Sequence, residues 1–276
     1  MTTIYEGLAL RLQASEHAAV LRLVLLGPAP GNAMGPDFWR ELPQAVAAAE
    51  AQSEARVLLI GGQGEHFSYG LDLPGMGAEL GAVLGAGAPG RVQVAALAER
   101  MHLGFLALAR SRLIAIAAVH GWCIGAGIEM IAACDIRLSS AEARFALREV
   151  KVGIVADLGG IQRLPHLIGE GWARQLALTG DTIDAATAAR IGLITEVAAD
   201  RAALETAALA MAERIAANPP LVLAGIKSVM NERIEAEVLR GNRQAAACNG
   251  SLMQSEDFAE AMRAFMEKRP ARFRGR

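Results

Sequence analysis

The chain has 276 residues, of which 53% are hydrophobic and 4% are aromatic, and its formal net charge is −2. A chain of this length can bury one full-sized core, and its composition excludes intrinsic disorder and a collagen-like structure. The near-neutral charge provides no protein-wide positive field, so we expect no nucleic-acid partner.

The N-terminal segment has the pattern of a folded domain. Residues 1–13 carry Glu6 and Arg11 within a strand-like pattern, instead of the basic and apolar regions of a signal peptide. The three cysteines form no CxxC pair, and an odd number of thiols suits a reducing compartment better than a disulfide framework. We therefore expect a cytoplasmic protein.

The first half of the chain alternates between strand-like and helical patterns. Apolar, strand-like runs occupy residues 8–13, 18–26, 55–62, 113–121 and 135–140. Helical patterns occupy residues 36–52 and 91–110. This alternation predicts an α/β core with parallel strands.

A glycine-rich segment lies between two of these elements, at residues 74–90. So many glycines give the backbone too much freedom for a well-formed helix. We expect either a mobile flap beside the functional site or a plain surface loop.

Beyond about residue 157 the pattern becomes helical, with one expected strand at residues 193–198. Residues 200–268 predict three or four helices, broken at residues 218–220, at Gly241 and at residues 249–251. We therefore divide the chain into a core at residues 1–200, which carries the site, and a helical module at residues 201–276.

The most apolar segment, residues 113–134, is long enough to cross a bilayer but contains Glu129. A carboxylate in hydrocarbon costs about 2.5–3.5 kcal/mol, which disfavours a membrane span. The better interpretation is a buried strand that turns into a buried helix.

Two segments, residues 57–73 and 116–130, share one pattern: an apolar run, a turn of small residues and a helix start. A helix N-terminus leaves backbone N–H groups unpaired, so two such ends that converge would form an oxyanion hole. Glu129 lies three residues after Ala126, which places both on one face of the second helix. A carboxylate desolvated there has a raised pKa, as a general acid or base near neutrality needs. The alternative is a buried glutamate satisfied by an arginine or by backbone groups.

Two further acids follow, Glu149 and Asp157. Each has a simpler interpretation when taken alone. Asp157 precedes a helical pattern and would serve as its N-cap. Glu149 lies near Arg148 and Lys151 and would form a surface ion pair of little energetic value.

The constellation resembles the crotonase family, the enoyl-CoA hydratases and isomerases, from about residue 20 to the C-terminus. The motifs on which this resemblance rests are "FSYGLDL" at residues 67–73, "HGWCIGAGIEMIAACDIRL" at residues 120–138 and the pair Glu129 and Glu149. The resemblance implies an α/β crotonase-type ββα spiral core, with thioester-binding N–H groups at Leu71 and Ala126.

The resemblance points to two activities. The pair Glu129 and Glu149 matches the catalytic glutamates of hydratases, whereas "NAMGPDFWREL" and "VADLGGIQRLP" look more like dienoyl-CoA isomerases, which carry an aspartate at the position of Asp157. Dienoyl-CoA isomerases usually have aspartate where this chain has Glu129. We expect double-bond isomerisation of a dienoyl-CoA, with hydration of a 2-enoyl-CoA as the alternative and a non-catalytic binding or scaffold protein as a remote one.

The resemblance also implies the binding groups. We expect Ser68, Tyr69, Gly70 and Gly125 around the two turns, where Tyr69 either narrows the pocket mouth or only packs. Phe265 and Lys268 would reach the bound CoA, in a neighbouring subunit of a trimer or dimer of trimers. Coenzyme A is then part of the acyl-CoA substrate, and no separate cofactor is expected. The histidines show no ligand spacing, so no metal site is expected.

Overall fold

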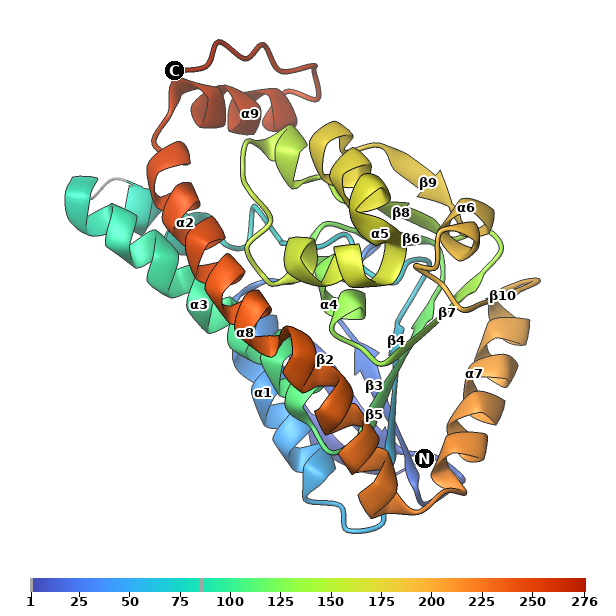
Figure 1. The fold of residues 1–276 in the computed structure, drawn as a ribbon. Helices are drawn as coiled ribbons and strands as arrows, with labels where there is room; N and C mark the ends of the chain where they lie inside the picture. Colours follow the sequence, from blue (N-terminus) through green and yellow to red (C-terminus); the bar gives the residue numbers. More distant parts are fainter. Residues whose placement is uncertain (1, 85–86) are drawn as a thin grey trace.

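The computed structural model describes residues 2–84 and 87–276. A twisted seven-stranded sheet forms its centre, in the order β1-β2-β3-β4-β5-β7-β10 (Figure 1). The first three strands are antiparallel to one another, and every later pairing is parallel. The strands are β1 (Thr3–Glu6), β2 (Leu10–Ala14), β3 (Val20–Leu25), β4 (Val57–Gly62), β5 (Ile114–Val119), β7 (Ile136–Ser140) and β10 (Glu196–Ala198).

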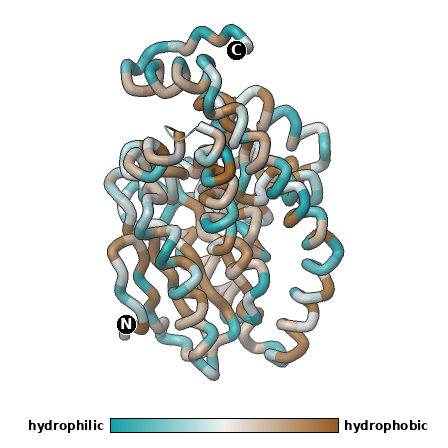
Figure 2. The backbone as a smooth tube through the Cα atoms, turned by 90° about the vertical axis from the view of Figure 1, so that its left-hand side faces the viewer, coloured by the Kyte–Doolittle hydropathy of each residue, from teal (hydrophilic) through white to brown (hydrophobic). Residues whose placement is uncertain are grey.

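Parallel strands at the centre are covered on both faces and therefore carry near-continuous apolar runs. All six residues of β5 are buried, as are five of the six in β4. In Figure 2 the central strands are largely brown, and the outer helices alternate brown with teal. The sheet was predicted from these same runs, and the α/β core is confirmed.

Helices cover the two faces of the sheet unequally. The face of α1, α3 and α4 builds the larger hydrophobic core, and α7 alone covers much of the other face (Figure 1). The helices are α1 (Pro36–Glu50), α2 (Gly77–Leu84), α3 (Gly87–Arg110), α4 (Ala126–Ala132), α5 (Gly160–Thr179), α6 (Ala185–Arg190), α7 (Arg201–Ala216), α8 (Pro220–Leu252) and α9 (Glu256–Met266).

A second, three-stranded sheet was not predicted, because its strands are only three residues long. It consists of β6 (Trp122–Ile124), β8 (Arg144–Ala146) and β9 (Thr182–Asp184). Strand β6 pairs parallel to β8, with Ile124 opposite Ala146. The segments that follow the two strands therefore leave the sheet at one edge, α4 from β6 and the 3₁₀ helix η1 (Glu149–Val152) after β8.

The expectation of a loop at residues 74–90 is wrong for most of the segment. Helix α2 and the start of α3 lie in it, and residues 85–86 are outside the described residues. The alanines and leucines between the glycines allow a helical conformation once tertiary packing adds to it. Leu80 of α2 packs against the core, and Val94 of α3 forms a small cluster with residues of the C-terminal helices.

The predicted breaks at Gly241 and at residues 249–251 are also wrong, because α8 continues through both. Gly241 serves close packing between helices: a Cβ there would lie 2.6 Å from Cγ of Gln162 on α5. Asn249 directs its side-chain amide to Val155 and Asp157 and does not end the helix.

The boundary predicted at residue 200 falls at the start of α7. This helix packs against β3, β4, β5, β7 and β10, whereas α8 packs mainly along α3 (Figure 1). Helix α3 is, among the described residues, the one helix long and apolar enough to cross a membrane, and 56% of its most apolar window is buried in the fold. Its contacts with α1, α2 and α8 account for its apolar character.

Candidate active site

One cavity of about 740 Å³ brings together all five residues that the sequence placed at the reaction centre. Its lining comes from α4, η1, the segment that precedes α5, and α9, among other parts of the chain. Its lining includes Leu71, Ala126, Glu129, Glu149 and Asp157.

Hydrogen bonds hold the two predicted oxyanion turns side by side. The N–H of Ser68 donates to the carbonyl of Trp122 (3.0 Å), and the N–H of Ile124 donates back to the carbonyl of Ser68 (2.9 Å). Gly70 and Leu71, two and three residues after Ser68, are thereby brought near Gly125 and Ala126, the first two residues after Ile124. The two turns therefore lie together, but the expectation of a helix start in both is wrong for the first: α4 begins at Ala126, whereas α2 begins only at Gly77.

Gly70 makes this close approach feasible. Its φ is +79°, in the left-handed region, and a Cβ there would lie 2.5 Å from the Ile124 carbonyl oxygen and 3.0 Å from the Ala126 nitrogen. Neither Leu71 nor Ala126 uses its N–H in a hydrogen bond within the described part of the chain. Ala126 is the first residue of α4, where an N–H has no intrahelical acceptor.

Replacing Gly70 by alanine is expected to lower kcat/KM about 10²- to 10³-fold, because the added methyl group would push the two donor turns apart. Steady-state kinetics with an acyl-CoA substrate measures this effect. Gly171→Ala is the matched control: a Cβ at Gly171 meets nothing within 4 Å. Equal activities of the two variants would contradict a role for the turn geometry.

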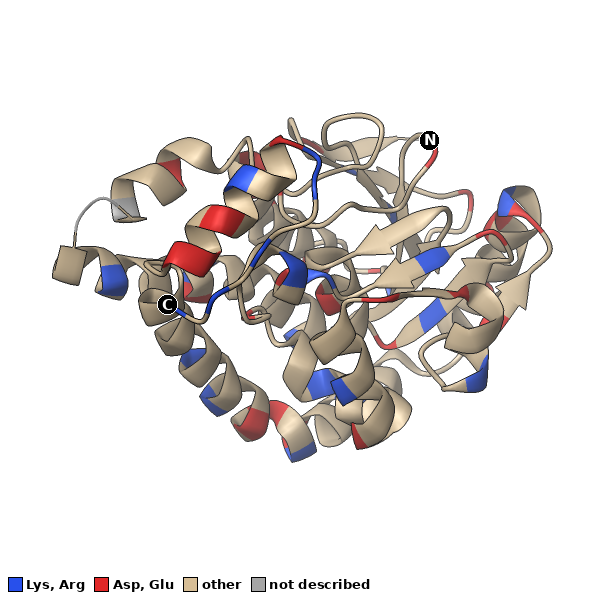
Figure 3. Ribbon diagram, turned by 90° about the horizontal axis from the view of Figure 1, so that it is seen from above, with Lys and Arg blue, Asp and Glu red and all other residues tan. Residues whose placement is uncertain are grey.

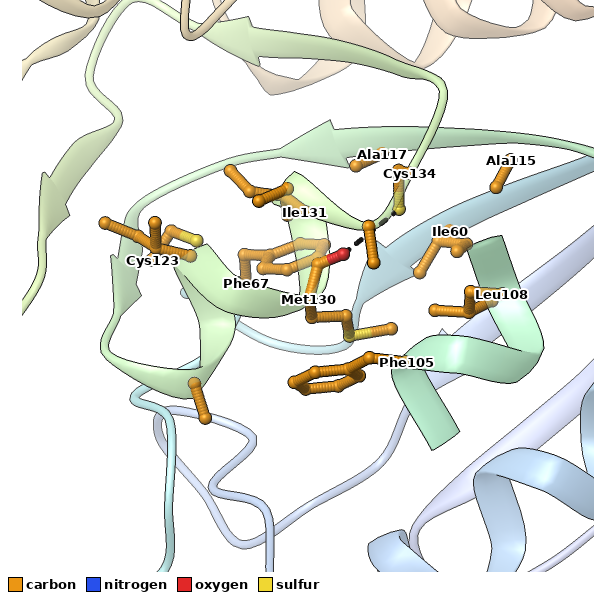
Figure 4. Packing of buried hydrophobic residues seen from close by; sticks show 14 of the residues in the cluster. Ile60, Phe67, Phe105, Leu108, Ala115, Ala117, Cys123, Met130, Ile131 and Cys134 are labelled. Atoms are coloured by element: carbon orange, nitrogen blue, oxygen red, sulfur yellow. Dashed lines mark hydrogen bonds between the residues drawn. The ribbon is translucent and has the colours of Figure 1, made fainter. Parts of the chain in front are cut away.

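Helix α4 is anchored by its apolar side. Met130 and Ile131 pack among Phe67, Phe105 and neighbouring core residues (Figure 4). All seven residues of the helix are buried, so Glu129 cannot leave the interior. The apolar residues of this segment therefore hold the Glu129 carboxyl group at a fixed position in the interior.

Glu129 is 1% exposed and accepts two backbone hydrogen bonds through Oε2. The donors are the N–H of Leu158 (3.0 Å) and the N–H of Gly160 (2.7 Å). Burial raises the pKa of Glu129 well above its ordinary value, and the nearby carboxyls of Glu149 and Asp157 raise it further. Backbone satisfaction, which the sequence left open as an alternative, is thus present in a residue that also lines the cavity.

Glu149 begins η1 and presses its carboxylate against the second turn. Its Oε2 is buried and has no hydrogen-bond partner among the described residues. A Cβ on Gly125, whose φ is +54°, would lie 2.9 Å from Glu149 Oε1. Burial raises the pKa of Glu149 to about 7, with a smaller contribution from Asp157. The expected surface ion pair with Arg148 or Lys151 does not form in the described structure.

Asp157 is not an N-cap, since Gly159 holds that position before α5. Its Oδ2 instead accepts a hydrogen bond from Nδ2 of Asn249 (2.8 Å). The Asn249 amide also donates to the Val155 carbonyl (2.7 Å) and accepts from the Val155 N–H (2.9 Å), and the residue is 1% exposed. Burial raises the pKa of Asp157 to about 6, although the bond from Asn249 lowers it. Asn249 was missed because its pattern indicated a helix break and no local signal links it to residue 157.

The remaining predicted binding residues fall into two groups. Tyr69, Gly125 and Phe265 line the cavity. Ser68 and Gly70 are not part of the lining but support the first turn, where Ser68 Oγ accepts a hydrogen bond from the Gly70 N–H (3.1 Å). Tyr69 packs on His66, with ring centroids 5.1 Å apart, so the expected packing is present, and the narrowing of the pocket mouth stays a prediction.

Three basic side chains line the cavity, but the predicted one, Lys268, is not among them. Lys268 is exposed and is not part of the lining, whereas Arg148, Lys151 and Arg269 are. The C-terminal tail folds back along the acidic face of α9 (Figure 3), where Arg269 pairs with Glu260 (2.5 Å). The fold-back brings Pro270, Ala271 and Phe273 into the wall of the cavity. Among the residues described, no cluster of three or more histidine, cysteine or acidic side chains could hold a metal ion.

The fold and this cavity define a class of enzyme in which protons are moved beside a carbonyl oxygen held by backbone amides. The sequence matches the enoyl-CoA hydratase/isomerase family over residues 15–276. The chain belongs to this family, and its α/β architecture is the crotonase fold.

Relatives of both expected activities are similar to the chain. It is 33% identical to the peroxisomal Delta(3,5)-Delta(2,4)-dienoyl-CoA isomerase of Arabidopsis thaliana, over 95% of each chain. It is also 33% identical to a crotonyl-CoA hydratase of Syntrophomonas wolfei, over 95% of this chain and 96% of that one. The crystal structure of an enoyl-CoA hydratase/isomerase from Pseudoalteromonas atlantica T6c matches with a TM-score of 0.82 at 26% identity, over 96% of this chain and 100% of the other.

Proposed function

We propose that the chain is a dienoyl-CoA isomerase that moves two conjugated double bonds of an acyl-CoA in fatty acid metabolism. Glu149 would take a proton from C2 of a 3,5-dienoyl-CoA, and the electron pair of that C–H bond would pass to the thioester as a dienolate. The N–H groups of Leu71 and Ala126 would hold the carbonyl oxygen as this charge develops. Asp157 would then deliver a proton at C6, which leaves the double bonds at C2 and C4.

The observation that carries the proposal is the position of Asp157 along the cavity. A largely apolar extension of about 40 Å³ adjoins the cavity; Asp157 and Leu71 line both spaces, whereas Glu149 lines only the larger one. The rest of the extension is almost wholly apolar, with side chains such as Leu80, Val94 and Phe258. An acyl chain that runs from the oxyanion turns into this extension would pass Glu149 first and Asp157 farther along.

Hydration of a 2-enoyl-CoA is the second candidate, supported by the similarity to the crotonyl-CoA hydratase and by the pair Glu129 and Glu149. In that reaction both glutamates would hold and activate water. Two backbone amides already occupy Oε2 of Glu129, which leaves only its other oxygen for a water molecule. This restriction makes the isomerase the better supported candidate and leaves Glu129 as the orienting acid.

Two separate incubations distinguish the candidates. We expect the ultraviolet absorbance of a 3,5-dienoyl-CoA to shift rapidly as the double bonds move, while a 2-enoyl-CoA keeps its conjugated absorbance. Rapid loss of the 2-enoyl signal without dienoyl turnover would reverse the ranking. No turnover of either substrate would favour a binding protein that keeps the fold.

The rate of isomerisation is expected to peak between about pH 6 and about pH 7. The base must be ionised, and burial raises the pKa of Glu149 to about 7, so base activity increases as the pH rises toward and through that value. The donor must be protonated, and burial raises the pKa of Asp157 to about 6, so donor activity is lost as the pH rises through that value. The dependence of kcat/KM on pH should therefore be bell-shaped and narrow. A flat profile from pH 5 to pH 9 would contradict these roles.

We also propose that Phe265 and the cations at the cavity mouth contact the CoA portion, and that Lys268 does so only in an assembled oligomer. Helix α8 carries an exposed apolar stripe that supports a trimer or a dimer of trimers: Val222, Ile226, Val229 and Met230 are more than half exposed. Light scattering of the purified protein tests this assembly, and a monomer would contradict it.

A cytoplasmic location is proposed from the cysteines. Cys123, Cys134 and Cys248 are all free, as expected in a reducing compartment. Cell fractionation with an antibody to the protein tests the location.

A further inference from the structure

A second cavity, of about 360 Å³, lies where the end of α3 meets α5 and the first half of α8. Four basic and two acidic side chains line it, so the described lining carries an excess of two positive charges. The basic residues are Arg110, Arg112, Arg163 and Lys227, and the acidic ones are Glu50 and Glu235.

Three of the four cations already have partners in the fold. Arg110 pairs with Glu235, and Lys227 pairs with Asp135 at 2.8 Å. The guanidinium of Arg112 donates to three backbone carbonyls near the end of α1. These groups shape the cavity but are engaged elsewhere.

Arg163 is the exception. It is only 5% exposed, and its guanidinium forms no hydrogen bond or ion pair with any described residue. Its Nε is fully buried without a partner. A guanidinium does not lose its proton in a protein, and a buried charge without a directly paired counter-charge is unfavourable. Glu235 and Asp135 attract this charge from nearby but pair with other cations, so the guanidinium can still accept an anion.

The neighbouring side chains do not supply that anion. His102 is buried beside Gly159 and cannot be negative. Burial and the charges of Arg163 and Arg110 lower its pKa to about 4, so it is neutral near pH 7. Glu235, the acid of α8 in the cavity, is engaged by Arg110. Glu50 accepts from the Ser111 hydroxyl and from the Arg112 N–H.

We propose that this cavity binds a small oxyanion, a phosphate or carboxylate group, on the guanidinium of Arg163. The planar fork of an arginine suits two oxygens of such a group, and the volume admits a phosphate with accompanying water. The site is distinct from the catalytic cavity, because the two linings share no residue. It lies one turn along α5 from Gly160, whose N–H binds Glu129.

The test is thermal unfolding of the purified enzyme in sodium phosphate and in sodium chloride of equal ionic strength. We expect phosphate to raise the unfolding midpoint saturably, by about 2–4 °C at concentrations well above Kd. Arg163→Met should lose this shift. Arg174→Gln should keep it, because Arg174 is an exposed residue of the same helix that pairs with Glu170. A phosphate shift that survives in Arg163→Met would overturn the proposal.

An acidic side chain of a second copy would bring the same chemistry to Arg163. In that case phosphate has no effect, and Arg163→Met lowers the oligomeric mass measured by light scattering. Should the variant fail to fold, crystals of the wild-type enzyme soaked in selenate give the answer by anomalous scattering. A selenium peak or a partner carboxylate within hydrogen-bond distance of the guanidinium supports the site, and neither at that position refutes it.

Discussion

Replacing Glu149 by glutamine is expected to lower kcat for a 3,5-dienoyl-CoA by about 10²- to 10⁴-fold, the usual contribution of a positioned general base. Glutamine keeps the size of the side chain but cannot accept the proton from C2. The substrate should still bind, because the oxyanion turns and the cavity wall are unchanged, so KM should change little. Steady-state kinetics in the ultraviolet assay measures both constants.

The same variant is expected to be more stable than the wild type above about pH 7. Burial raises the pKa of Glu149 from 4.5 to about 7, so the folded protein binds this proton more tightly than the unfolded chain does. Stability is therefore lost as the pH rises from about 5 to about 7, and glutamine avoids this loss. Unfolding midpoints measured across this pH range should diverge between the two proteins.

Glu196→Gln serves as the control for both measurements, because Glu196 is an exposed residue of β10. It should leave kcat and the pH dependence of stability unchanged. Full activity in Glu149→Gln would show that another residue is the base and would contradict the proposed mechanism. Low activity with an unaltered stability profile would indicate that the residue is not desolvated.

The parts of the site that could be predicted from sequence are those set by local chain geometry. A buried strand followed by small residues and a helix start leaves free N–H groups, as at Ala126 in the second turn. The first turn departs from this pattern, because α2 begins only at Gly77 and Leu71 instead forms a β-bridge with Met34. The spacing from Ala126 to Glu129 needs only the helical period. The position of Glu149 was harder to predict, because it depends on the pairing of two short strands, β6 and β8.

The parts that could not be predicted depend on contacts between distant segments. Asn249 meets Asp157 across 92 positions, and the sequence around it favours a turn. Gly241 also has a tertiary role, since it admits the Gln162 side chain between α5 and α8. Helix α2, within residues 74–90, packs against α3 and the C-terminal helices, whereas the glycine content of the segment favoured a loop.

Replacing Asp157 by asparagine is expected to abolish isomerisation and to spare the first chemical step. Without a proton donor at C6, turnover of a 3,5-dienoyl-CoA should fall about 10²- to 10⁴-fold. Glu149 would still remove the C2 proton, so exchange of that proton with deuterated solvent, followed by NMR, should stay within a few-fold of wild type. Asparagine can still accept the bond from Asn249 through its side-chain oxygen, so the turn before α5 should keep its shape.

The comparison of exchange with turnover separates the roles of the two acids. Asp181→Asn is the control, because Asp181 is exposed and its carboxylate forms no hydrogen bond or ion pair in the described structure. If Asp157→Asn loses exchange and turnover together, Asp157 acts on C2 or supports the whole site, and the assignment of a far-carbon donor fails. If it retains both and Glu149→Gln loses hydration of a 2-enoyl-CoA, the two glutamates carry the chemistry and the enzyme is a hydratase. Only loss of turnover with retained exchange requires two acids at different distances along one acyl chain.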